Sequence, residues 1–151
     1  MHAKVRALAL KICYTVFMSY EGYFSGWFDG ATEYTNPGRM GIGCVLKTES
    51  GQIVATDSIA LGYGTSNIAE WRALLRLLEL AIDLKVKKLV VYGDSQLVIN
   101  QCTGKNKVKK EHLQSLKMIH DSLVENIERI IYVWIPRELN EEADELSTMC
   151  F

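Results

Sequence analysis

The sequence predicts an α/β fold with a mixed five-stranded sheet, three antiparallel strands followed by parallel strands, flanked by helices. Two patterns support this prediction. Residues 22–63 contain runs of apolar and small residues separated by tight turns, which is typical of an antiparallel meander. From residue 66 onward, amphipathic helices alternate with short apolar strands, and such crossovers require parallel pairing.

The meander is predicted from three strands and two turns. Aromatic and small residues alternate in the first strand, Gly22–Asp29, and a turn at 35–38 leads to the second, Met40–Lys47. A turn at 49–51 then leads to the third strand, Gln52–Tyr63. Asn and Gly tolerate the backbone angles of such turns and Pro fixes one of them, so both connections predict hairpins.

The second half begins with a helix over Ser66–Lys85, in which apolar residues recur every three or four positions and Ser66 is the predicted N-cap. The continuous apolar run Lys88–Tyr92 predicts a strand buried on both faces. The elements that follow are a helix over Ser95–Cys102 capped by Ser95, a lysine-rich loop over Thr103–Lys109, a helix over Glu111–Glu125, a strand over Ile130–Trp134 and a helix over Asn140–Cys150. The tryptophans, Trp27, Trp71 and Trp134, are all expected to belong to the core rather than to a stacking surface.

Length and composition indicate one domain. A chain of 151 residues buries roughly 70% of its unfolded surface, and a net charge of −1 argues against a uniformly basic protein, although it leaves local patches open. The four cysteines lack metal-binding spacing and fit a reducing compartment, so a cytoplasmic location is expected. Residues 1–21 are predicted to be an N-terminal extension to a domain at residues 22–151. Lys11 interrupts the apolar run of the extension, which fits neither a signal peptide nor a membrane span.

Four carboxylates are the candidate functional residues. Asp29 and Asp94 close apolar strands, whereas Glu70 and Asp144 lie about one turn inside predicted helices. Each has a structural alternative: Asp94 can cap the next helix, Glu70 can complement a helix dipole, and Asp144 can belong to a solvated face. Brought together, the four would form a cluster of negative charge suited to divalent cations, and this predicts metal-dependent phosphodiester chemistry.

Four motifs carry these acids, namely Phe28-Asp29-Gly30, Thr65-Ser66-Asn67-Ile68-Ala69-Glu70, Gly93-Asp94-Ser95-Gln96 and Asn140-Glu141-Glu142-Ala143-Asp144-Glu145-Leu146. In their order and their elements they resemble the signature blocks of type 1 ribonuclease H, over roughly residues 22–148. The resemblance implies a ribonuclease H-like fold. It also implies an endoribonuclease that hydrolyses the RNA strand of RNA–DNA hybrids and leaves 5′-phosphate and 3′-hydroxyl ends.

The resemblance further implies two Mg²⁺ ions, with Mn²⁺ as a substitute. Asp29 would bridge both ions, Glu70 and Asp94 would share the ion near the leaving 3′-oxygen, and Asp144 would hold the ion that carries the attacking water. Small residues beside Asp29 would allow close approach of a sugar. Gly30 and Ala31, beside Asp29, are therefore expected to bind substrate. The resemblance implies further that Asn67 and Gln96 reach the minor groove and that Asn36 and Thr65 lie near a DNA phosphate. Asn140 is the last expected substrate-binding residue. Helix capping and surface polarity are the alternatives for Asn36, Asn67 and Gln96, and Asn140 can either orient Asp144 or cap the last helix.

The sequence departs from the family pattern in two ways. The segment before the last helix has no histidine, and Arg137 or Glu138 could take its place near phosphate or metal-bound water. The basic protrusion of some members is also missing, which leaves loop lysines such as Lys105 and Lys107 for phosphate contacts and predicts weaker hybrid binding.

Two alternative functions stay open at this level. One is a catalytically silent module on the same fold that binds a hybrid or another partner, and the missing histidine is the argument for it. The other is a nuclease of the same fold with a different nucleic-acid substrate, such as a branched-DNA resolvase. The expected partner is an RNA–DNA hybrid, with no membrane, no obligatory protein partner, and a monomeric state.

Overall fold

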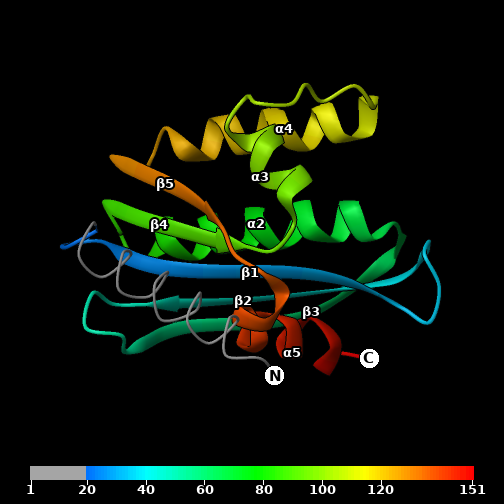
Figure 1. The fold of residues 1–151 in the computed structure, drawn as a ribbon, viewed down its shortest axis with the longest axis horizontal. Coiled ribbons are helices and arrows are strands. Elements are labelled where there is room, and N and C mark those ends of the chain that lie inside the picture. Colours follow the sequence, from blue (N-terminus) through cyan, green and yellow to red (C-terminus); the bar gives the residue numbers. More distant parts are fainter. Residues whose placement is uncertain (1–19) are drawn as a thin grey trace.

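A computed structural model describes residues 20–151, which form a mixed five-stranded sheet with helices on both faces (Figure 1). The predicted N-terminal extension therefore lies outside the described residues, apart from Tyr20 and Glu21. The strands are β1 (Phe24–Glu33), β2 (Gly38–Lys47), β3 (Ile53–Gly64), β4 (Lys88–Gly93) and β5 (Arg129–Trp134), in the spatial order β3-β2-β1-β4-β5. This architecture confirms the predicted fold class.

The pairing between β1 and β4 ends inside the sheet, and the place just beyond the last pair is called here the gap between β1 and β4. β1 and β2, and likewise β2 and β3, are antiparallel, whereas β1–β4 and β4–β5 are parallel. Pairing between β1 and β4 ends at Phe28 and Gly93. β1 continues beyond this point with β2 as its neighbour, so Asp29 and Asp94 are the residues that follow the last β1–β4 pair. Such an edge at the carboxyl ends of neighbouring strands is a common place for sites in α/β sheets.

The helices divide between the two faces of the sheet. They are α2 (Ser66–Asp83), α3 (Gln96–Cys102), α4 (Glu111–Val124), the short 3₁₀ helix η1 (Arg137–Leu139) and α5 (Glu141–Met149). In Figure 1, α2, α3 and α4 lie on one face and α5 lies on the other, beside β2 and β3. No helix among the described residues is long and apolar enough to cross a membrane.

The main core lies between α2, α3, α4 and the sheet, and a smaller one lies on the opposite face around Val90, Tyr92 and Ile135. Successive residues of β4 enter the two cores in turn: Leu89 and Val91 face the first, and Val90 and Tyr92 face the second. This confirms the prediction that β4 is buried on both faces.

The start of α2 differs from the prediction by one residue. Thr65, not Ser66, is the N-cap, and its Oγ1 accepts a hydrogen bond of 3.2 Å from the Ile68 amide. Ser66 is the first helical residue and pairs instead with Asn36, whose Nδ2 donates to Ser66 Oγ (2.9 Å) and whose Oδ1 accepts from the Ser66 amide (3.0 Å). The predicted cap of α3 is confirmed, since Ser95 Oγ accepts from the Val98 amide at 3.3 Å.

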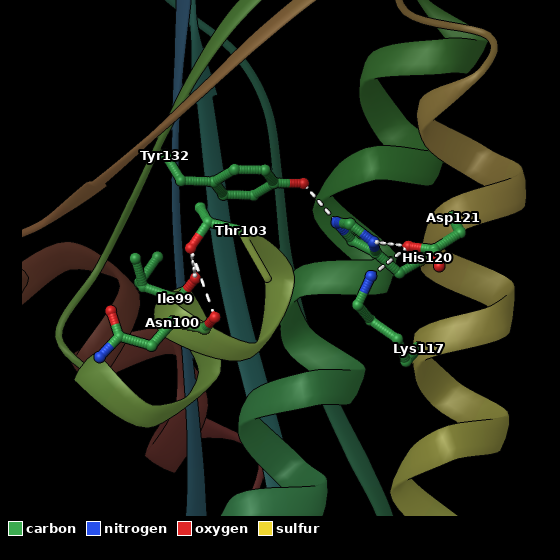
Figure 2. Close-up of polar contacts among 7 residues, drawn as sticks. All are labelled: Ile99, Asn100, Thr103, Lys117, His120, Asp121 and Tyr132. Atoms are coloured by element: carbon green, nitrogen blue, oxygen red, sulfur yellow. Dashed lines mark hydrogen bonds and ion pairs between the residues drawn. The ribbon is translucent and has the colours of Figure 1, made fainter. Parts of the chain in front are cut away.

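A polar network centred on the buried His120 joins α4 to β5 (Figure 2). His120, 3% exposed, contacts the hydroxyl of Tyr132 through Nε2 and Oδ1 of Asp121 through Nδ1, and Lys117 donates to the same carboxylate at 2.6 Å. The edge of its ring lies against Trp71. Burial lowers the pKa of His120, which favours its neutral form. His120 therefore serves to pack α4 against its neighbours.

Candidate active site

Three carboxylates meet at the gap between β1 and β4. One oxygen from each of Asp29, Glu70 and Asp94 lies within 4.8 Å of the other two. Asp29 comes from β1, Glu70 from the second turn of α2, and Asp94 from the residue after β4. The structure thus brings together residues that are 41 and 24 positions apart in the sequence (70 − 29 and 94 − 70).

Gly30 explains how Glu70 reaches this gap. A Cβ at Gly30 would lie 2.2 Å from both the Ala69 carbonyl carbon and the Glu70 amide nitrogen, so α2 rests directly on the backbone of β1. Any larger residue would push the helix away and move the Glu70 carboxylate from Asp29. The absence of a side chain at Gly30 is therefore explained by helix packing, and a contact of its backbone with substrate stays a prediction.

A second close approach places Asp144. A Cβ at Gly43, which pairs with Asp29 across the β1–β2 ladder, would lie 2.3 Å from the Ala143 carbonyl oxygen and 2.4 Å from the Ser147 amide. α5 is seated on this glycine, and its first turn carries Asp144 to within hydrogen-bonding reach of Asp29. The fourth predicted acid thus belongs to the same cluster.

Burial and neighbouring charges raise the proton affinity of Asp29, Glu70 and Asp94. Burial, followed by the charges of Asp94 and Asp144, raises the pKa of Asp29 from 3.8 to about 7, although a hydrogen bond with Glu70 acts in the opposite direction. Burial and the charge of Asp29 raise the pKa of Glu70 well above 4.5. Burial also raises the pKa of Asp94, against a hydrogen bond from Asn140 that lowers it. The cluster consequently retains protons that separated carboxylates would lose.

Asn140 is a buried link between β1, the Asp94 loop and α5. It is 1% exposed, and its Nδ2 donates to the Phe28 carbonyl (2.9 Å) and to Asp94 Oδ2 (3.1 Å). Although it occupies the N-cap position of α5, its side chain makes no capping hydrogen bond. Asn140 is therefore the N-cap residue of α5 by position, as one of its two predicted roles has it, but its side chain holds Asp94 instead of capping the helix.

The donor set of this cluster fits hard divalent cations. Four neighbouring carboxylates supply the oxygen ligands that Mg²⁺ and Mn²⁺ prefer. Glu70 Oε2 is buried and has no hydrogen-bond partner among the described residues, which is an energetically poor state for a carboxylate oxygen unless it binds a cation. A cation would also offset the burial and the charge repulsion that raise the pKa values of Asp29, Glu70 and Asp94.

The other predicted substrate residues lie around the cluster. Asn67 and Thr65 are half-buried at the start of α2, where Asn36 joins the β1–β2 hairpin to Ser66. Gln96 is exposed at the start of α3, and Ala31 is half-buried on β1. These places are compatible with substrate contact, which stays a prediction for each of them.

The predicted accessory residues divide into two groups. Arg137 lies beside the cluster, with its Nη2 at 3.5 Å from Asp144 Oδ1, and its charge lowers the pKa of Asp94. Glu138 is exposed on the same turn and acts on the pKa of Asp94 in the opposite direction. Lys105 and Lys107 are exposed in the loop between α3 and α4.

One sequence prediction about the tryptophans was wrong. Trp71 is fully buried, and Trp27 stacks on Tyr92 with ring centroids 5.0 Å apart, but Trp134 is 45% exposed. Trp134 lies opposite Gly93 in the β4–β5 register, and its Nε1 donates to the backbone carbonyl of Asp94 at 3.0 Å. Sequence reasoning placed this residue in the core because it ends an apolar strand, and a strand end next to the gap is open to solvent.

Comparisons with known proteins agree with this geometry. Residues 27–150 match a family model described as reverse transcriptase-like. The chain is 35% identical to ribonuclease HI of Halobacterium salinarum over 126 residues, which cover 83% of this chain and 63% of the relative. It is also 37% identical over 113 residues to a bifunctional protein of Mycobacterium tuberculosis, covering 74% of this chain but 31% of that protein.

Solved structures show the same similarity. The crystal structure of RNase H1 from Halobacterium salinarum superimposes with a TM-score of 0.80 at 35% identity, covering 83% of this chain and 95% of that one. LC11-RNase H1 in complex with an RNA/DNA hybrid superimposes with a TM-score of 0.78 at 32% identity, covering 84% and 95%. The chain therefore spans less than two thirds of the curated relatives' own length but nearly the whole of these solved domains.

Proposed function

This chain belongs to the type 1 ribonuclease H family, and we propose that it is a metal-dependent endoribonuclease that hydrolyses the RNA strand of RNA–DNA hybrids. The products would carry 5′-phosphate and 3′-hydroxyl ends. The observation that carries the proposal is the convergence of Asp29, Glu70, Asp94 and Asp144 at one gap in the sheet. The similarity to a solved ribonuclease H1 with bound RNA/DNA hybrid supports the substrate class.

The four acids would hold two Mg²⁺ ions, or Mn²⁺ ions in their place. Bound there, such ions supply an activated water on one side of a phosphodiester and charge stabilisation for the leaving oxygen on the other. Asn140 would keep the Asp94 carboxylate oriented through its 3.1 Å hydrogen bond, so that the acid needs little reorganisation when it binds a cation. Glu70, held against β1 at Gly30, would be fixed by helix packing in the same way.

The outer residues have different proposed tasks. Arg137 is 77% exposed beside Asp144, with which it forms an ion pair, and its guanidinium would bind a phosphate. Asn67 and Gln96 each carry donors and an acceptor, which suit the 2′-hydroxyls and base edges of a shallow minor groove. Lys105 and Lys107 would add affinity that depends on salt and is independent of sequence.

A cleavage assay with matched substrates tests this proposal. The protein is incubated with end-labelled RNA–DNA hybrid, duplex RNA and duplex DNA, each with Mg²⁺, Mn²⁺ or chelator. Asp94→Asn is the test variant, and Asp83→Asn is the control, because Asp83 is an exposed carboxylate at the end of α2. We expect metal-dependent cutting of the hybrid alone, lost in Asp94→Asn and kept in Asp83→Asn.

The same assay separates the rival functions. Tight hybrid binding without cutting under either metal would identify a catalytically silent module. Metal-dependent cutting of a branched or duplex DNA instead of the hybrid would identify a nuclease of the same fold with another substrate. Hybrid cutting that persists in chelator, or in Asp94→Asn, would contradict the proposed role of the acid cluster.

A further inference from the structure

Trp134 is unusual among the three tryptophans because a large part of its indole is open to solvent. It is 45% exposed, whereas Trp71 is fully buried and Trp27 is stacked on Tyr92. Burying an indole releases a large apolar area from water, so an aromatic side chain left exposed at a defined place is informative. Its place here is the carboxyl end of β5, next to the end of β4 and the acid cluster.

The exposed ring is held in one position. Its Nε1 donates a hydrogen bond of 3.0 Å to the backbone carbonyl of Asp94, the residue whose carboxylate belongs to the cluster. One edge of the indole is therefore fixed to the site, while much of the remaining surface faces solvent. A ring fixed in this way loses little conformational freedom when it binds a ligand.

The surroundings of Trp134 favour nucleic acid as the ligand. Two residues after Asp94, α3 begins and presents the exposed side chains of Gln96 and Leu97, the latter 46% exposed. An indole offers its face to a base or to the C–H groups of a sugar, and each such contact contributes roughly 1–3 kcal/mol without sequence preference. A phosphodiester at the acid cluster would bring its flanking nucleotide to this side of the site.

We infer that Trp134 is a substrate-contacting residue that packs against the nucleotide next to the cleaved phosphodiester and fixes its register. This inference rests on the proposed function. The contact is made by the ring, and the hydrogen bond to Asp94 serves to hold the ring in place. Loss of the ring should therefore weaken binding more than loss of the N–H group.

Two substitutions separate the ring from its N–H group. Trp134→Phe keeps an aromatic ring without the donor, and Trp134→Ala removes both. We expect KM for the hybrid to rise roughly ten-fold in Trp134→Ala and less than three-fold in Trp134→Phe. Met118→Ala on the outer face of α4 is the control, because Met118 is an apolar side chain that is 73% exposed at a different place, and it should leave KM unchanged. Equal loss of kcat in both Trp134 variants with unchanged KM would overturn the inference and indicate a role in positioning Asp94 alone.

Fluorescence provides a readout that does not require cleavage. In the Asp29→Asn protein, acrylamide should quench Trp134 strongly, and hybrid should protect it. The Trp134→Phe version of the same protein, which retains the two less accessible tryptophans, supplies the background signal. Hybrid that binds without protecting Trp134 would overturn the inference and leave the proposed function intact. Protection of Trp134 by hybrid in Asp29→Asn, together with no cutting of any substrate by the wild-type protein, would support the contact and refute the proposed activity.

Discussion

Replacement of Asp29 by Asn should stabilise the metal-free protein at pH 8. The pKa of Asp29 is raised from 3.8 to about 7 by burial and by the charges of Asp94 and Asp144. A group whose pKa is higher in the folded than in the unfolded state contributes stability below its unfolded pKa, and that contribution is lost as pH rises through the folded value. The wild-type protein in chelator should therefore lose stability between about pH 4 and pH 7, and the variant should lose less.

The expected magnitude follows from the same values. At 1.36 kcal/mol for each pKa unit, the rise from 3.8 to about 7 corresponds to roughly 4 kcal/mol. Water entry and side-chain rearrangement around Asp29 reduce this figure, so we expect Asp29→Asn to gain about 1–3 kcal/mol at pH 8. For a domain of this size the gain is a rise in Tm of roughly 3–10 °C.

Thermal unfolding in chelator and in Mg²⁺, at pH 5 and pH 8, measures the effect. Mg²⁺ should raise the Tm of the wild-type protein at pH 8, because a cation that binds the folded state alone stabilises it, and it should have little effect on Asp29→Asn. Asp57→Asn is the control. Asp57 forms a 2.7 Å ion pair with Arg76, and neither residue belongs to the acid cluster. Loss of this ion pair should destabilise the protein slightly at both pH values. A lower Tm for Asp29→Asn at pH 8 in chelator would refute the electrostatic account.

Three further predictions concern residues around the acids. Asn140→Ala removes two hydrogen bonds of a buried amide, so it should lower the free energy of unfolding by about 1–3 kcal/mol in urea melts and reduce kcat for hybrid cleavage. Gly43→Val places a side chain against the backbone of α5, so it should displace Asp144 and abolish both cleavage and the Mg²⁺-dependent rise in Tm. Replacing Lys105, Lys107 and Lys109 by Gln should reduce the slope of log affinity against log salt by up to about 0.9 per lysine that meets a phosphate, and an unchanged slope would exclude the loop from the interface.

The order of elements and the four acids could be predicted because both depend on local patterns. The three-to-four apolar spacing of α2 and the continuous apolar run of β4 fix the type of each element. Asp29 and Asp94 could be identified because each closes an apolar run in the sequence, although in the structure only Asp94 follows the end of its strand. The predicted end of the first strand was wrong. The strand was predicted to end at Asp29, but β1 extends to Glu33, because its second half still pairs with β2.

The sequence did not predict how the helices reach the site. In the sequence, Gly30 and Gly43 are indistinguishable from other strand glycines. In the structure they allow α2 and α5 to touch the sheet backbone. This contact brings Glu70 and Asp144 to Asp29. These contacts join residues 39 to 104 positions apart (69 − 30 and 147 − 43), so no local pattern contains them. The cap of α2 was misplaced for a simpler reason: Thr65 and Ser66 are both good caps, and the partner that engages Ser66 comes from the distant residue Asn36.

The acidic groups and the order of strands and helices could be predicted from the sequence, because hydrophobic periodicity and turn chemistry act over a few residues. Which of these groups lie close together depends on how the elements pack. Asn140 donates to Phe28 and Asp94, 112 and 46 residues away, and Trp134 is open to solvent rather than buried. Burial and hydrogen-bond partners depend on the packing of whole elements, which no short segment contains. The gap between β1 and β4, where the acids meet, likewise exists only in the assembled sheet.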